Sequence, residues 1–492
     1  MSLNFNISQS ESFCNDVFHY IHKNEIKSLT RKYPHHKDLI MNEVESNNFE
    51  GSYNESLTFN LVLNEQNIRI TILGLGEKKE LSNEKIFRIS SSITYKLTLL
   101  KKKMSSIDVS LPSSFTKNDC ENVLLGLYNG HYAFDKYKTK KANLENLNIN
   151  IVFGSVKSNV FESIVRRVKG VSKGVNMTRD LVNEQPFILT PQKMADYAKQ
   201  ISKNKNISCK ILDHNQLRKK GMLGIWDVGK GSSNLPRFIH LTYKSKATKK
   251  KVRKVALIGK GMTYDSGGLS IKPADFMLTM KMDMAGAGCV LGVFESLGAL
   301  QPDNIEVHGI VPTAENMLGP NAYKPDDIVN GLSGKTIEVI NTDAEGRVIL
   351  SDAIEYTNKL GVDEMIDLAT LTGACMVALG NFTAGLFSNT QKQADKILKI
   401  SNDAGEKIWQ LPLDEDLRPS IDSNIADIKN SASTRYGGAT TAAMFLQFFV
   451  DKNIPWSHID IAGPAYIDSK RNWLAPGATG FGVMTLIKYL GF

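Results

Sequence analysis

The chain has 492 residues, of which 42% are hydrophobic and 23% charged, and its formal net charge is +9. These values are typical of a globular protein, and the length predicts two domains. The sequence contains no apolar run of 18 residues and its N-terminus lacks a basic, apolar leader, so neither a transmembrane helix nor a signal peptide is expected.

The first 155 residues alternate between strand-like and helix-like segments. Strands are predicted at 57–63, 68–76, 106–111 and 147–154, and helices at 83–103 and 118–137. This alternation indicates a small α/β domain, which we expect to span residues 1–158.

A long helical stretch follows at 160–184 and ends before Pro186. We interpret residues 159–184 as a helix that connects two domains. A second helix is predicted to start at Thr190 and Pro191, because threonine caps helices and proline suits the first helical position. The lysine-rich segment 244–254 is expected to be an exposed loop.

From residue 255 the predicted strands are almost entirely apolar. They lie at 255–259, 306–312, 364–371 and 458–462, and each ends in a glycine-rich or polar segment. Strands buried on both faces are typical of a mostly parallel sheet flanked by helices. We therefore predict a larger α/β domain over 185–492, with its ligand site at the carboxyl ends of the strands.

Charge is distributed unevenly along the chain. Residues 1–250 hold 39 Lys and Arg against 23 Asp and Glu, whereas the remainder holds 21 against 28. The basic first half is consistent with a solvated lysine-rich surface, because few aromatic residues interleave with the lysines. Excess acid in the second half suits cation binding.

The five cysteines are odd in number and far apart, and they form no Cys-x-x-Cys pair. This pattern argues against a disulfide framework or a zinc ribbon, and it suits a reducing cytosol. The cysteines are predicted to be small buried residues.

Two carboxylates and an arginine stand together in the segment "NTDAEGRVIL" at 341–350. The residues before this segment alternate as in a strand, and those after it have apolar residues at helical spacing. Asp343, Glu345 and Arg347 are therefore predicted to lie at a junction between a strand and a helix.

Further charged residues follow the strand at 255–259. Lys260 and Asp265 precede two glycines that allow a tight turn, Lys272 comes before Pro273, and Asp283 lies among methionines and small residues. Each acid alone is explained by a turn or a helix cap. Four clustered acids would repel one another unless cations compensated them, and they suit two divalent ions better than one.

The same segments resemble those of the leucyl (cytosol) aminopeptidase family, the M17 metallopeptidases. The resemblance lies in "GKGMTYDSGGLSIKP", "MKMDMAGA" and "NTDAEGR", and it extends to "TRDLVNEQPFILTP" and "GGATTAAMFLQFFV", so that it covers 175–492. The α/β alternation of the first 155 residues fits the smaller N-terminal domain of that family.

The resemblance implies a two-metal site with five ligands. Asp265 and Glu345 would bridge the ions, Asp343 would complete the more exchangeable position, and Lys260 and Asp283 would complete the tighter one. The ions would be Zn²⁺ or Mn²⁺, with Mg²⁺ or Co²⁺ as further candidates. A lysine ligand must be neutral, which an adjacent cation can enforce by lowering its pKa.

The resemblance also implies a mechanism and its catalytic residues. A water activated by the metals would attack the first peptide bond of a short peptide. Lys272 would stabilise the oxyanion of the tetrahedral intermediate. Arg347 would hold a bicarbonate ion that accepts the proton of the water.

Five residues match positions that line the family's pocket for the N-terminal side chain. They are Met280, Thr370, Gly373, Ala462 and Ala465. Their apolar character predicts a preference for leucine-like residues. The resemblance further implies a homohexamer in the cytoplasm, with no membrane partner.

Two other functions are consistent with parts of the sequence. A two-metal phosphoesterase would use the same carboxylates, but no phosphate-cradling loop accompanies them beyond Lys272 and Arg347. A DNA-binding role is allowed by the basic first half, but the sequence shows no helix-turn-helix or aromatic-interleaved patch in its support.

Overall fold

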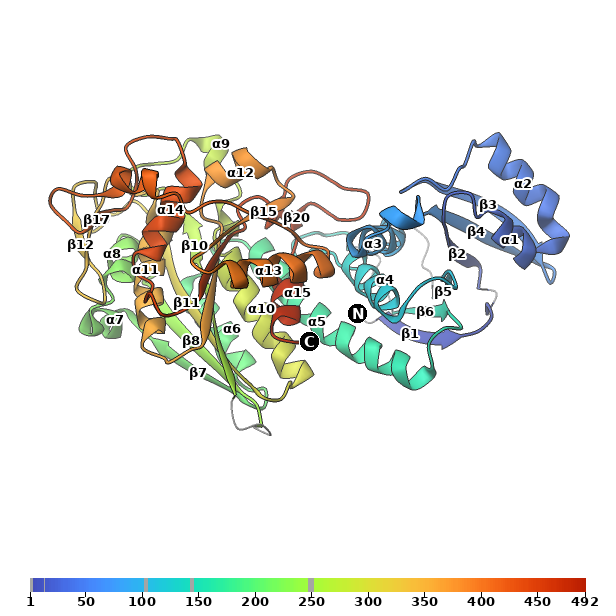
Figure 1. The fold of residues 1–492 in the computed structure, drawn as a ribbon, viewed down its shortest axis with the longest axis horizontal. Coiled ribbons are helices and arrows are strands. Elements are labelled where there is room, and N and C mark those ends of the chain that lie inside the picture. The colour runs from blue at the N-terminus through green and yellow to red at the C-terminus, as the bar shows by residue number, and fades with distance from the viewer. Residues whose placement is uncertain (1–2, 13, 101–104, 142–145, 247–251) are drawn as a thin grey trace. The chain divides into compact units, whose positions relative to one another are not determined.

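The computed structural model describes the chain except for residues 1–2, 13, 101–104, 142–145 and 247–251 (Figure 1). It divides into two compact units. Unit 1 comprises Met1–Ser172 and Ser469–Ala475, and unit 2 comprises Lys173–Asp468 and Pro476–Phe492. The division falls inside helix α5 (Ser158–Asn183). The domain limits that we expected at residues 158 and 184 stay predictions.

Unit 1 contains a six-stranded sheet in the order β1-β6-β5-β2-β4-β3, in which only the β3–β4 pair is antiparallel. Its strands are β1 Leu3–Ser8, β2 Asp16–Ile21, β3 Ser56–Leu63, β4 Gln66–Gly74, β5 Ser106–Ser110 and β6 Leu147–Val152. Its helices include α1 Lys27–Lys32, α2 Lys37–Ser46, α3 Asn83–Leu99 and α4 Lys117–Gly130. The predicted α/β architecture is confirmed.

Several element boundaries in unit 1 differ from the predictions. Helix α4 ends at Gly130, so the predicted helix at 118–137 was too long. The end of the predicted helix at 83–103 lies outside the described residues. Strands β1 and β2 were not predicted, although every residue of β2 is buried.

Unit 2 contains a nine-stranded sheet in the order β16-β15-β18-β14-β9-β11-β8-β7, with β10 paired to β11. Its strands are β7 Ile207–Leu212, β8 Arg237–Lys244, β9 Arg253–Gly259, β10 Gly261–Asp265, β11 Ile305–Asn316, β14 Glu364–Ala369, β15 Thr383–Ser388, β16 Lys407–Gln410 and β18 Trp456–Asp460. The central strands β18, β14, β9 and β11 are parallel, and the sheet is mixed because β15–β18, β8–β11 and β7–β8 are antiparallel. This confirms the predicted mostly parallel, mixed sheet.

Helices cover both faces of this sheet. Ile258 of β9 shares a hydrophobic core with residues of α8, α11 and α14. The next residue, Gly259, faces α10, since a β-carbon there would lie 2.4 Å from the carbonyl oxygen of Gly286. Because neighbouring strand residues point to opposite faces, α10 and α11 flank the sheet from either side.

The helices of unit 2 include α6 Pro191–Ile201, α7 His214–Lys220, α8 Leu223–Gly229, α9 Ala274–Met277, α10 Ala285–Leu300, α11 Glu345–Asn358, α12 Gly373–Leu379, α13 Gln391–Ala404, α14 Gly438–Gln447 and α15 Val483–Tyr489. Helix α6 begins as predicted, with the Thr190 side chain accepting a hydrogen bond from the Lys193 amide. Two small sheets complete the unit, formed by β12 Ile328–Asn330, β13 Thr336–Glu338 and β17 Ile428–Lys429, and by β19 Tyr466–Ile467 and β20 Gly477–Ala478.

The segment Ala274–Leu300 is long and apolar enough to span a membrane by length and composition alone, since an 18-residue window within it has a mean hydropathy of 1.3. However, 67% of this window is buried inside the structure, and α10 packs against β9, β11 and β14. That is the environment of a core helix.

The five cysteines are free. Cys120, Cys289 and Cys375 are buried, as predicted, whereas Cys14 and Cys209 are half-buried. Burial raises the pKa of the Cys120 and Cys375 thiols to about 12, so these groups are unreactive at neutral pH.

Candidate active site

Three buried carboxylates from separate parts of unit 2 converge beside the central strands. Asp265 ends β10, Asp283 precedes α10, and Glu345 is the first residue of α11. One oxygen of each lies within 4.8 Å of the others. Asp343 lies two residues before α11, so the predicted strand-to-helix junction is confirmed. The preceding strand, β13, belongs to the small three-stranded sheet and not to the main one.

Two lysines contact these acids. The Nζ of Lys260, between β9 and β10, lies 2.8 Å from Asp283 and 2.8 Å from Glu345. The Nζ of Lys272 lies 2.9 Å from Asp265 and 2.5 Å from Asp343. The cluster thus contains six of the seven charged residues that the sequence singled out. The seventh, Arg347, lies two residues after Glu345 on α11.

The electrostatics of the cluster follow from burial and from these contacts. Burial, together with the neighbouring Glu345, raises the pKa of Asp265 to about 7, and burial also raises the pKa of Asp283 and Asp343. Burial acts against ionisation of Glu345 too, but Lys260 and Lys272 outweigh it and lower its pKa. The acids in turn outweigh burial at Lys260 and raise the pKa of its ammonium group.

The donor set fits divalent cations. Asp283 Oδ2, Asp343 Oδ1 and Glu345 Oε1 are buried and face lysine nitrogens at ion-pair distance, yet none of them accepts a directed hydrogen bond. Oxygens that are buried without hydrogen bonds carry a desolvation cost that a bound cation removes. Because carboxylate oxygens are ligands for Mn²⁺ and Mg²⁺ and also for Zn²⁺, this chemistry suits several metals.

The side chain of Asn316 fixes two of the acidic segments relative to each other. Asn316 ends β11 and is paired with Asp265 in the parallel β10–β11 register. Its amide donates to Asp265 Oδ1 at 2.8 Å and to the carbonyl oxygen of Thr342 at 2.9 Å. Tyr323 donates to the same carbonyl at 2.7 Å. The loop that bears Asp343 is thereby tied to the strand that bears Asp265.

The two glycines after Asp265 are required by this arrangement. Gly267 and Gly268 have φ angles of +86° and +65°, in the left-handed region that favours glycine. A β-carbon at Gly268 would lie 2.8 Å from Asn316 Oδ1. The tight turn predicted from the sequence is confirmed.

Arg347 is buried on α11, where one nitrogen of its guanidinium donates to the carbonyl oxygen of Asn430 at 2.9 Å. Its Nε makes no hydrogen bond. Burial lowers the pKa of Arg347 to about 10, against the opposing effects of Glu345 and Asp460. The group remains a cation at neutral pH, with capacity to bind an anion.

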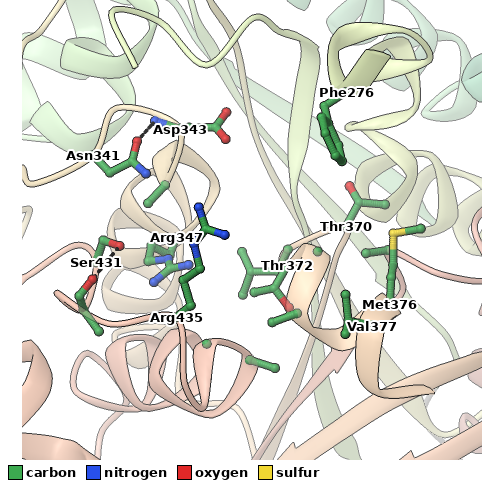
Figure 2. Close-up of a pocket in the computed structure, with 18 of the residues that line it drawn as sticks. Phe276, Asn341, Asp343, Arg347, Thr370, Thr372, Met376, Val377, Ser431 and Arg435 are labelled. Carbon is green, nitrogen blue, oxygen red and sulfur yellow. Dashed lines mark hydrogen bonds between the residues drawn. The ribbon is translucent and has the colours of Figure 1, made fainter. Parts of the chain in front are cut away.

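A cavity of about 1070 Å³ opens beside the charged cluster (Figure 2). All four acids and both lysines line it, together with Arg347. Of the predicted pocket residues, Met280, Thr370, Gly373 and Ala462 line it. Ala465 is buried and does not line this cavity.

Sequence reasoning missed several residues of the cavity wall. Phe276, Met376 and Val377 form an apolar side with Thr370, and the segment 431–440 closes the opposite side. Figure 2 shows Ser431 and Arg435 of this segment across the cavity from Met376 and Val377. The glycine pair at the start of α14, within the stretch "RYGGA", was the available signal for a loop close to a ligand.

A buried carboxylate connects two loops that line the cavity. Asp460, at the end of β18, accepts hydrogen bonds from the Leu371 and Ala462 amides, each at 3.1 Å. It also accepts one from the Thr372 hydroxyl at 2.7 Å. Asp460 therefore joins the loop after β14 to the loop after β18, and both loops contribute lining residues.

Comparison with protein families gives two matches. Residues 176–487 match the catalytic domain of the cytosol aminopeptidase family, and residues 22–141 match the N-terminal domain of the same family. Together these matches account for most of the chain.

Individual proteins agree with the family match. A probable cytosol aminopeptidase of Aquifex aeolicus is 40% identical over 472 residues, covering 96% of this chain and 94% of the relative. One from Sulfurihydrogenibium is 45% identical over 425 residues, covering 86% and 83%.

Solved structures show the same similarity. A mutant of tomato leucine aminopeptidase aligns with a TM-score of 0.88 and 32% identity, covering 99% of this chain and 96% of that one. The bottromycin maturation enzyme BotP in complex with Mn aligns with a TM-score of 0.83 and 29% identity, covering 97% and 98%.

Proposed function

Since this chain belongs to the cytosol aminopeptidase family and is a metallo-aminopeptidase, we propose that it removes apolar, leucine-like residues from the N-termini of short peptides. The nucleophile in this proposal is a metal-activated water, with two ions held per subunit. The observation that supports it best is the convergence of Asp265, Asp283 and Glu345, with one oxygen of each within 4.8 Å of the others.

We propose five side chains as the metal ligands, in the roles that the family resemblance implies. Asp265 and Glu345 would be shared by two ions, Asp343 would complete the site of one ion, and Lys260 and Asp283 would complete the site of the other. Zn²⁺ and Mn²⁺ are the favoured ions, with Mg²⁺ and Co²⁺ as alternatives, and the manganese complex of BotP supports Mn²⁺. When bound, two such ions lower the pKa of a shared water and polarise the scissile carbonyl.

Two residues of the chain would stabilise negative charge and bind the proton acceptor beside this centre. The Lys272 ammonium group donates to the oxygen on which negative charge develops, as an oxyanion-hole donor does. Arg347, which is cationic and has a buried Nε without a hydrogen bond, would hold a bicarbonate ion, and that ion would supply a base for the proton of the water. Within the described part of the chain, its one hydrogen bond goes to the Asn430 carbonyl, which leaves most of its donors for that anion.

The apolar side of the cavity provides the pocket for the N-terminal side chain. We assign this role to Met280, Thr370, Gly373 and Ala462, which line the cavity, and we leave out Ala465, which does not. Lys260 donates to the Thr370 carbonyl at 3.0 Å, which links this wall to the charged cluster. Hydrolysis of leucyl, phenylalanyl and lysyl anilides tests the assignment, and a preference for lysine would overturn it.

Hydrolysis of leucine amide tests the proposed function. A chelator should abolish turnover, and Mn²⁺ or Zn²⁺ should restore it. Lys272→Ala and Arg347→Ala should each lower kcat by at least about 100-fold, because charge stabilisation in the transition state is lost. Metal content, measured on the same samples, should stay at two ions per subunit in both variants. Full turnover by either metal-loaded variant would contradict its role.

The remaining features of the proposal concern the whole protein. We propose a homohexamer in the cytoplasm, following the family resemblance and the names of the relatives.

Two alternative roles have their own tests. Hydrolysis of nitrophenyl phosphate without amide hydrolysis would favour the phosphoesterase alternative. A DNA mobility shift that weakens with salt would add a nucleic-acid role to the basic first half of the chain.

A further inference from the structure

Four cationic side chains line the cavity, and three of them are engaged within the protein. Lys260 and Lys272 are ion-paired with the acids, and Arg347 donates to the Asn430 carbonyl. The fourth is Arg435, in the loop between β17 and α14. Among the residues that the structure describes, no acidic side chain forms an ion pair with Arg435.

Arg435 belongs to the cavity wall formed by the segment 431–440. It lies on the side of the cavity opposite Thr370, Met376 and Val377 (Figure 2). The same loop leads into α14, whose N-cap residue, Gly437, provides no side-chain hydrogen bond to the first turn. The residues of this first turn, from Gly438 to Thr440, also line the cavity. The positive end of the helix therefore reinforces the charge of Arg435.

Bound cations would shift the charge balance of the cavity toward positive. Its lining carries four acidic and four basic side chains, which cancel formally. Divalent cations held by the acids would give the cavity a net positive charge, and Arg435, which has no acidic partner among the described residues, adds to it on its own side. A substrate that brings a negative charge to that side is therefore favoured over an uncharged one.

A short peptide carries a negative charge on its C-terminal carboxylate, close to the scissile bond. In the proposed function its α-amino end lies at the acids and its first side chain at the apolar wall. The second residue then extends toward the loop of Arg435. An extended dipeptide spans about 7 Å, so its free C-terminal carboxylate lies one residue beyond the scissile bond, on that side of the cavity.

We propose that Arg435, together with the first turn of α14, forms a subsite for the free C-terminal carboxylate of dipeptide substrates. The inference rests on the proposed aminopeptidase function and goes beyond it, because it makes the enzyme selective for dipeptides. Guanidinium groups bind carboxylates through paired, charge-assisted hydrogen bonds, so arginine suits this role better than lysine.

The test compares leucylglycine with leucylglycine amide, in which the same dipeptide lacks the terminal charge. The wild-type enzyme should prefer the free acid in kcat/KM. In Arg435→Gln the ratio of acid to amide should fall about tenfold, which is the range expected for one charge-assisted hydrogen bond. The loss should appear in KM, and raising the ionic strength should weaken the preference in the wild type only. Arg435→Lys should retain part of the ratio.

Lys452→Gln serves as the matched control, since it removes an exposed cation from a loop outside the cavity. Its acid-to-amide ratio should equal that of the wild type. An unchanged ratio in Arg435→Gln would overturn the subsite. Failure of the wild-type enzyme to cleave either dipeptide or leucine amide would instead overturn the proposed function, so the two failures are distinguishable.

Discussion

Asn316 shows how one uncharged side chain can organise a charged site. It is 1% exposed, and both hydrogens of its amide are used, one on Asp265 and one on the loop before Asp343. Its own backbone oxygen accepts from the Ser266 amide at 3.0 Å and from the Ser266 hydroxyl at 2.7 Å. Both proposed ligand segments therefore depend on Asn316 for their relative position.

Asn316→Ala should weaken metal binding. The amide that orients Asp265 is lost, and removal of such a supporting hydrogen bond typically lowers metal affinity by about 10- to 100-fold. Titration calorimetry with Mn²⁺ measures the effect without any reliance on turnover. Asn330→Ala, at an exposed position on β12, is the control and should bind Mn²⁺ as the wild type does. Equal affinity in the two variants would show that Asn316 does not support the site.

The proposed site residues were accessible from the sequence because glycines and charges mark them locally. Lys260, Asp265 and Lys272 follow a predicted strand within 13 residues, and the structure brings all three into one cluster. Arg435 was not recognised, because an exposed arginine in a loop has no local pattern. Its position in the cavity lining depends on the tertiary arrangement of the loop before α14, which the local sequence does not reveal.

At the scale of single elements, Thr372 links the start of α12 to the cavity. Its side chain accepts from the Cys375 amide at 3.0 Å and donates to Asp460 at 2.7 Å. Thr390 occupies the equivalent position before α13, but it forms no side-chain cap hydrogen bond. Both threonines are therefore N-cap residues, but only the Thr372 side chain caps its helix with a hydrogen bond.

Thr372→Val should lower the free energy of unfolding by about 1–2 kcal/mol, because it removes a helix cap and a hydrogen bond to a buried carboxylate. Thr390→Val should change it by less than about 0.5 kcal/mol. Urea unfolding of both variants measures the two changes in the free energy of unfolding. Equal losses would contradict the account of α12.

The antiparallel pair β8–β11 contains a histidine pair. His240 Nε2 lies 2.9 Å from His308 Nδ1, and His240 Nδ1 lies 3.0 Å from the Tyr356 hydroxyl. Burial, with smaller contributions from His308 and Lys210, lowers the pKa of His240 to about 4. The folded chain therefore binds fewer protons at this residue than the unfolded chain does.

This pKa predicts a loss of stability in mild acid. The contribution of a neutral His240 is complete above pH 6.5 and declines as the pH falls toward 4, by on the order of 1–3 kcal/mol. Urea unfolding between pH 7 and 4.5 should show a steeper decline for the wild type than for His240→Gln. Parallel pH profiles would contradict this assignment.

The elements themselves were predicted unevenly. Apolar strands such as β9 and β14 were found because a buried parallel strand has a continuous apolar sequence. The short strands β12 and β17 were missed, because three- and two-residue strands are fixed by tertiary pairing and not by periodicity. Strand β2 was missed although it is fully buried, since its sequence, "DVFHYI", mixes polar and aromatic residues.

For the whole molecule, the untested expectation is the oligomeric state. The structure leaves large apolar side chains exposed, among them Phe187, Trp409 and Ile425, each at 65% or more. We predict that light scattering after gel filtration gives six copies of the 54.5 kDa chain. A monomeric mass for fully active enzyme would contradict the hexamer while leaving the metal site unaffected.

The two-metal centre is the central claim for the molecule as a whole, because catalysis and dipeptide selectivity both depend on it. Anomalous diffraction from crystals soaked in Mn²⁺ locates bound ions directly. We predict two peaks per subunit within coordination distance of Lys260, Asp265, Asp283, Asp343 and Glu345. Soaked crystals whose five side chains bind no ion, or whose manganese lies elsewhere, would contradict the account.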